Sequence, residues 1–163
     1  MKMRAELGEH VALMARAWLG TPYQHQASLR LVGADCLGLV RGLWREVYGE
    51  EPQGVPPYTP DWAERGSGED LRDAAQRWLV RRPEGQMQVG DVLVFRMRPQ
   101  AVAKHCGVLT SLQGPEPKFI HAYWARSVVE SWMGDWWRKR IVAAFGWPEV
   151  AGVGVAESHE GKV

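Results

Sequence analysis

The sequence lacks both an excess of charge of one sign and any long apolar run. Its 20 Lys and Arg residues nearly balance 19 Asp and Glu residues, which gives a formal net charge of +1. This balance argues against partners bound through bulk electrostatics, so we expect neither nucleic acid nor a membrane surface as a partner. No apolar run approaches the roughly 20 residues of a membrane span. A chain of 163 residues can bury a core unaided, which predicts one globular domain.

The first residues also lack the features of a signal peptide. Residues 1–6 read MKMRAE, and this charged start leads into an amphipathic segment without an apolar h-region. We therefore expect a protein that is made in the cytoplasm without a signal peptide. If it acts outside the membrane, another route must deliver it.

Cysteine is scarce, because the chain contains only Cys36 and Cys106. Neither an export signal nor a cysteine-dense framework supports a disulfide between them, so we do not expect this bond. Tryptophan is abundant for this length, with nine residues. Those in the C-terminal half can fill a core or line a groove, and they are Trp124, Trp132, Trp136, Trp137 and Trp147.

The hydrophobic period changes along the chain from helical to strand spacing. Apolar residues at three- and four-residue spacing predict helices over residues 6–19, 36–48 and 69–81. Short apolar runs predict strands over residues 91–95, 104–112, 119–124, 127–132 and 140–145. Because the connections between these strands are short, we expect antiparallel pairing. This order predicts an α+β fold, with N-terminal helices packed on a C-terminal antiparallel sheet of about five strands.

The other segments show no usable periodicity. Residues 24–33 are predicted as a loop, and the Pro- and Gly-rich residues 50–68 as a surface loop. Residues 151–163 are expected to form a flexible tail. Residues 1–150 then form a single domain.

Cys36 opens the second predicted helix. A residue at a helix start meets unpaired backbone N–H groups and the positive end of the macrodipole, which favours a thiolate. Asp35 is a candidate N-cap, although its charge should partly oppose ionisation of the thiol. Most free cysteines are small buried hydrophobes. Position alone therefore leaves a nucleophile and a core residue both open.

His105 and His121 supply a candidate base and a candidate orienting group. If residues 104–110 and 116–123 form a hairpin centred on Gln113, the two histidines face each other on one face of the sheet. Cys106 then points to the opposite face, which predicts a core residue. A thiol, a base and a third polar group together favour nucleophilic catalysis. The alternative is that each histidine is a satisfied polar residue on a half-exposed sheet.

A zinc site is a further alternative, because Cys36, Cys106, His105 and His121 all have suitable ligand chemistry. However, the sequence has no close CxxC or HxxxH spacing. Strand alternation also separates His105 from Cys106, so the two cannot easily share a metal ion. We expect neither a metal ion nor a cofactor.

Five short motifs occur in order between residues 12 and 148. They are GTPY at 20–23, DCLGLV at 35–40, VGDVLVF at 89–95, HCGV at 105–108 and FIHA at 119–122. Together they resemble the NlpC-type family of papain-like cysteine peptidases. The Pro-rich stretch at 58–62 and the run FRMR at 95–98 most resemble the phage and gene-transfer-agent branch of cell wall peptidases.

The resemblance implies a papain-like fold and hydrolysis of peptide-stem amide bonds in bacterial peptidoglycan, often between D-glutamyl and diaminopimelate residues. It implies that Cys36 is the nucleophile, His105 the general base and His121 the third, orienting member of the catalytic set. It also implies a substrate-binding role for Tyr23 and Asp35, which are similar to positions that hold the free amino end of the peptide stem.

The resemblance leaves delivery and activity open. No accessory wall-binding domain is recognised, so a phage tail, a gene-transfer-agent particle or lysis would bring the protein from the bacterial cytoplasm to the cell wall. One alternative is a phage tail or particle assembly component that retains the fold with little or no hydrolase activity. Another is acyl transfer or amidase action on a different amide.

Overall fold

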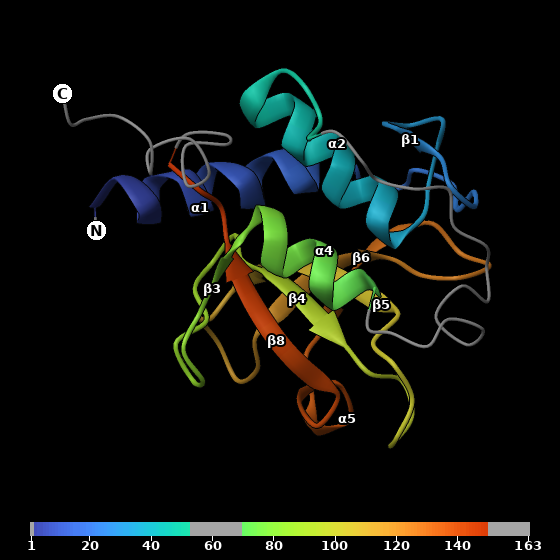
Figure 1. Cartoon of the computed structure of the whole chain (residues 1–163). Helices are drawn as coiled ribbons and strands as arrows, with labels where there is room; N and C mark the ends of the chain where they lie inside the picture. Colours follow the sequence, from blue (N-terminus) through green and yellow to red (C-terminus); the bar gives the residue numbers. More distant parts are fainter. Residues whose placement is uncertain (1, 53–69, 150–163) are drawn as a thin grey trace, which may run out of the picture.

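The computed structural model describes residues 2–52 and 70–149. The predicted tail, and the predicted loop from residue 53 onward, lie outside the described residues. Within the described part, helices pack on one antiparallel sheet, which confirms the predicted α+β class (Figure 1). None of the described helices is long and apolar enough to cross a membrane.

The two longest helices lie together on one side of the sheet. Helix α1 spans Lys2–Arg16 and helix α2 spans Cys36–Tyr48. α1 begins earlier than predicted. It also ends earlier, because the chain turns after Arg16 and reaches Gly20 with a φ of 85°. α2 has the predicted bounds, and Gly49 caps its C-terminus with a φ of 89°.

The main sheet has six strands in the spatial order β3–β8–β4–β5–β6–β7, with every neighbouring pair antiparallel. Five of them confirm predicted strands, and their bounds are β4 Val92–Phe95, β5 His105–Ser111, β6 Lys118–Ala122, β7 Val128–Trp132 and β8 Ile141–Gly146. The sixth, β3, spans Val80–Arg81 and corrects the helix predicted over 69–81. Helix α4 spans only Asp70–Trp78, because β3 leaves the helix to pair with the edge of β8.

Three short elements were not predicted. Strands β1 (Ser28–Leu29) and β2 (Gly33–Ala34) pair antiparallel within the segment predicted as a loop. Helix α5 spans Asp135–Arg138, between β7 and β8. Elements of two to four residues are too short to show a hydrophobic period, so the sequence pattern could not reveal them.

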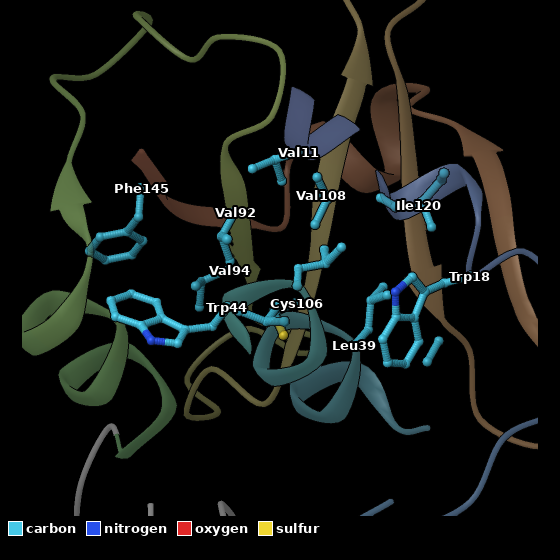
Figure 2. Packing of buried hydrophobic residues seen from close by; sticks show 14 of the residues in the cluster. Val11, Trp18, Leu39, Trp44, Val92, Val94, Cys106, Val108, Ile120 and Phe145 are labelled. Carbon is cyan, nitrogen blue, oxygen red and sulfur yellow. The ribbon is translucent and has the colours of Figure 1, made fainter. Parts of the chain in front are cut away.

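The main hydrophobic core lies between the helices and the sheet. Figure 2 shows Val11 of α1 and Trp44 of α2 facing Val92, Val108 and other side chains of the sheet. Cys106 is 1% exposed within this core, which confirms the predicted core position. The core therefore fixes α2, and with it Cys36, against the sheet.

The opposite face of the sheet carries a smaller hydrophobic cluster. It consists of Leu93, Phe95, Leu109, Phe119 and Met133, with Trp137 of α5 packed against it. His105 pairs directly with Phe95 across β4 and β5, so its ring lies on this second face. The base and the thiol thus come from different sides of the sheet.

Candidate active site

Asp35 caps the start of α2, as predicted. Its Oδ1 accepts a hydrogen bond from the Gly38 N–H at 2.7 Å, and its Oδ2 accepts one from the Gln26 N–H at 2.7 Å. A Cβ at Gly38 would lie 1.8 Å from the carbonyl oxygen of Ala27, so only glycine permits this close approach. The local sequence therefore places Cys36 at the first position of a capped helix.

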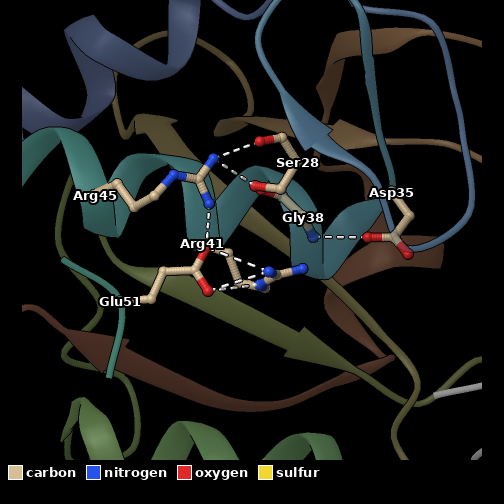
Figure 3. Close-up of polar contacts among 6 residues, drawn as sticks. All are labelled: Ser28, Asp35, Gly38, Arg41, Arg45 and Glu51. Atoms are coloured by element: carbon tan, nitrogen blue, oxygen red, sulfur yellow. Dashed lines mark hydrogen bonds and ion pairs between the residues drawn. The ribbon is translucent and has the colours of Figure 1, made fainter. Parts of the chain in front are cut away.

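Strand β1 and α2 are joined by a network of charged side chains (Figure 3). The Arg45 guanidinium donates to the Ser28 backbone oxygen and, at 2.9 Å, to the Ser28 hydroxyl. Glu51 accepts hydrogen bonds from both Arg45 and Arg41. Because these contacts hold the segment before Cys36 to the body of its helix, they limit movement of the thiol.

The Cys36 thiol lies half-buried where α2 meets the start of β5. Its Sγ is 3.9 Å from the backbone oxygen of Lys104. A hydrogen bond from the Cys106 side chain, together with a hydrogen bond and positive charge from His105, holds the pKa of Cys36 well below its ordinary value, although burial opposes the shift. The hydrogen bond with Cys36 and burial raise the pKa of Cys106, so Cys106 stays a thiol. Cys36 is thus the thiolate of the pair.

Two buried imidazoles extend from this thiol across the sheet. His105 Nε2 lies 2.8 Å from His121 Nδ1, and His121 Nε2 lies 2.9 Å from Ser131 Oγ. Burial, and then the nearby charge of His105, lower the pKa of His121 to about 3. His121 is therefore neutral at neutral pH and can accept a hydrogen bond from His105. Because Nε2 of His105 is engaged in this way, its Nδ1 is the nitrogen left for the thiol.

The histidines meet diagonally, and the predicted register is wrong by two residues. Leu109 pairs with Phe119, and continuing this register places Gly107, not His105, opposite His121. The prediction missed an irregularity near the end of β5. A shift of two residues keeps every side chain on its face, whereas a shift of one would have separated the histidines.

Gly107 makes the diagonal contact possible. A Cβ at this position would lie 2.8 Å from the Ile120 carbonyl oxygen and 3.1 Å from the His121 Cβ. The absence of a side chain leaves the space through which the His105 and His121 rings approach. The only sequence signal for this glycine is its place in the HCGV motif, two residues after His105.

Trp137 covers the histidine pair. Its ring centroid lies 5.8 Å from that of His105 and 5.1 Å from that of His121. It also packs edge-on against Phe95 at 5.2 Å. This apolar cover excludes water from the hydrogen bond between the two imidazoles, which strengthens that bond. From the sequence alone Trp137 can be either a core residue or part of a groove, because the short α5 that carries it shows no hydrophobic period.

Tyr23 lies close to both Cys36 and Asp35. Burial, and then the charges of Cys36 and Asp35, raise the pKa of Tyr23 to about 12, so its hydroxyl stays protonated. The structure thus brings together all five residues singled out from the sequence. The substrate-binding role of Tyr23 and Asp35 stays a prediction, and Asp35, only 2% exposed, uses its carboxylate to cap α2.

Neither cysteine forms a disulfide bond. In the part of the chain that the structure describes, no group of three or more His, Cys, Asp or Glu side chains is placed to hold a metal ion. Strand alternation excludes Cys106 as a partner of His105, because the two side chains point to opposite faces of β5. It does not reveal that the core face of β5, which carries Cys106, is also the face against which Cys36 packs.

A thiolate at a helix start, an imidazole beside it and a second, neutral imidazole form the nucleophile, base and orienting group of covalent acyl-transfer chemistry. They lie here on an α+β fold of the papain-like class. Residues 20–145 match the model of the NlpC/P60 family, and the chain belongs to this family.

Solved structures with the same fold include the NlpC/p60 domain of the peptidoglycan hydrolase SagA, with 21% identity and a TM-score of 0.54 over 85% of this chain and 97% of that domain. NlpC1 from Trichomonas vaginalis is 17% identical, with a TM-score of 0.58 over 87% of this chain. A Staphylococcus aureus protein of the NLP/P60 family is 19% identical, with a TM-score of 0.56 over 86% of this chain. The present chain spans only 44% and 41% of the length of these last two proteins.

No match was found among curated proteins. At these identities the structural neighbours show the fold alone. They do not bear on the phage and gene-transfer-agent branch, which therefore stays a prediction.

Proposed function

We propose that this chain is a cysteine peptidase that hydrolyses amide bonds in the peptide stem of bacterial peptidoglycan. The observation that carries the proposal is the 2.8 Å contact between the imidazoles of His105 and His121, at the start of the strand against which Cys36 lies. Membership of the NlpC/P60 family and the likeness to the SagA domain support the substrate class.

The proposed reaction begins with attack of the Cys36 thiolate on an amide carbonyl carbon. Backbone N–H groups of Cys36 and Leu37, which have no intrahelical acceptor, stabilise the oxyanion at the helix start. His105 gives its proton to the leaving amine as the C–N bond breaks, and a thioester remains on Cys36. A water molecule then loses a proton to His105 and attacks the thioester, which releases the acid product and restores the thiolate.

The bond proposed to be cut joins D-glutamyl and diaminopimelate residues. A stem with a free amino end carries an ammonium group, and the Asp35 carboxylate and the Tyr23 hydroxyl, which lie close to Cys36, are the candidate partners for it. An ammonium near Asp35 would also offset the negative charge that opposes the thiolate. The proposed route to the wall is a phage-like particle or release at lysis.

The test is mass spectrometry of muropeptides released from purified peptidoglycan by wild-type protein and by Cys36→Ala. We expect wild-type protein to release stem fragments whose masses identify the bond, and Cys36→Ala to release none while keeping its circular dichroism spectrum. Leu13→Ala is the matched control, because Leu13 is 63% exposed on α1, which carries none of the site residues. Equal digestion by Cys36→Ala would contradict the proposal. Inactive wild-type protein would favour the particle component instead.

A further inference from the structure

Ser131 lies at the far end of the hydrogen-bonded chain that starts at Cys36. It pairs directly with Phe119 across β6 and β7, while His121 pairs with Val129. Ser131 and His121 therefore share one face of the sheet as diagonal neighbours. The Ser131 hydroxyl oxygen lies 2.9 Å from His121 Nε2, and the residue is half-buried. Three strands thus contribute one side chain each: His105, His121 and Ser131.

The direction of the hydrogen bonds between His105, His121 and Ser131 decides whether His105 can act as the base. When His105 is an imidazolium, its Nε2–H must donate, so His121 must present a lone pair at Nδ1. A neutral imidazole carries one proton, and that proton then sits on His121 Nε2 and points at Ser131. In the opposite tautomer, His121 Nδ1–H would donate to His105 and force the neutral His105 to carry its proton on Nδ1. His105 could not then take the proton of the Cys36 thiol.

We propose that Ser131 is a positioning residue, whose hydroxyl oxygen accepts the His121 Nε2–H and so fixes the tautomer that lets His105 act as the base. The inference rests on the proposed function, because it assigns a role within that same site. Ser131 is half-buried, so its own hydroxyl proton can be donated to solvent. A hydroxyl is suited to this place because it accepts a hydrogen bond without adding a second charge beside the imidazolium.

Threonine and valine at position 131 provide a matched pair of variants. Both are β-branched and suit a strand, and they have nearly the same shape, but only threonine retains the hydroxyl. We expect Ser131→Thr to keep most of the wild-type kcat. We expect Ser131→Val to lower kcat by about five- to tenfold with little change in KM, the size that the loss of one hydrogen bond predicts. The two variants should unfold at similar temperatures.

Two measurements test the proposal without using peptidoglycan as a substrate. Nitrogen-15 NMR of the wild-type imidazoles should show His121 protonated at Nε2. The pH profile of Cys36 alkylation by iodoacetamide should shift to higher pH in Ser131→Val but not in Ser131→Thr, because the imidazolium partner of the thiolate is less stabilised.

A wild-type His121 protonated at Nδ1 would overturn the proposal, as would equal kcat values and equal alkylation profiles for the threonine and valine variants. If Ser131→Val does not fold, the NMR measurement on wild-type protein still decides. If peptidoglycan is not the substrate, the tautomer and the alkylation profiles remain measurable. Failure of this inference is thus distinct from failure of the proposed function.

Discussion

On the helix-covered face of the sheet the buried side chains are almost all apolar, whereas the opposite face carries His105, His121 and Ser131 among aromatic rings. The first face holds the helix that presents the thiol. The second holds the base and the groups that orient it. The two meet where β5 begins, since His105 is the first residue of that strand. The nucleophile and the groups that move its proton therefore come from different sides of one sheet.

The largest effect is expected at the base. His105→Ala removes the group that takes and returns the proton, so kcat should fall by about 10²–10⁴-fold. The free energy of unfolding should also fall, by about 1–3 kcal/mol, because the ring is buried and its removal leaves His121 Nδ1 without its partner. Initial rates of muropeptide release, with urea unfolding as the companion measurement, check both points. A variant that loses stability but keeps its rate would contradict the assignment of the base to this face.

The next effect is a pH dependence of stability at His121. Its pKa is lowered from 6.5 to about 3 in the folded protein. As the pH falls below 6.5, the unfolded chain gains a proton that the folded chain does not, so stability decreases from pH 6.5 down to pH 3, by about 4–5 kcal/mol. His121→Phe keeps an aromatic ring among Phe119 and Trp137 and cannot titrate, so this contribution should vanish while activity falls.

Urea unfolding at several pH values measures the effect. His10→Phe serves as the control, because His10 is exposed on α1 and its replacement should leave the acid-side loss in place. An unchanged acid-side slope in His121→Phe would show that His121 does not stay neutral in the folded state.

A third prediction concerns the helix-covered face. Leu43 of α2 is fully buried in the main core, so Leu43→Ala should lower the free energy of unfolding by about 2–5 kcal/mol. At a temperature where the variant is folded, kcat should stay close to that of the wild type. Denaturant titration and single-temperature rates separate these quantities. A large loss of kcat in fully folded protein would show that the core tunes the reaction as well as supporting it.

Much of this arrangement was predictable from local sequence signals. The helical spacing after Cys36 and the cap at Asp35 gave α2 with its observed bounds, and five strands were found. The contact between His105 and His121 was also predicted, although the register was two residues off. The predicted contact is still present in the structure, because a shift of two residues keeps both side chains on the same face of the sheet. In contrast, Ser131 contacts His121 only because β7 pairs with β6, and Trp137 covers the histidines because of where α5 lies. No local sequence pattern predicts the register of that pairing or the position of that helix.

A smaller effect is expected at Gly107, which lies beside His121 on the face of the sheet that carries the histidines. Gly107→Ala places a Cβ 2.8 Å from a backbone oxygen and 3.1 Å from His121, so β6 must shift. We expect a loss of about 1–3 kcal/mol in stability and a lower kcat. Gly134→Ala is the control, because its Cβ would make only ordinary contacts of 3.4 Å or more with Glu116. Equal behaviour of the two variants would contradict the close approach at Gly107.

The smallest effect is expected at Cys106, on the helix-covered face. Cys106 is the core residue whose thiol donates to Cys36, so Cys106→Val should raise the pKa of Cys36, because the thiolate loses that hydrogen bond. Because the thiolate then forms at higher pH, the acid limb of kcat/KM and the pH profile of iodoacetamide alkylation should both move upward. Cys106→Ser retains a donor and should move them less. Coincident profiles for wild type and Cys106→Val would mean that His105 and the helix start hold the thiolate without help from the core.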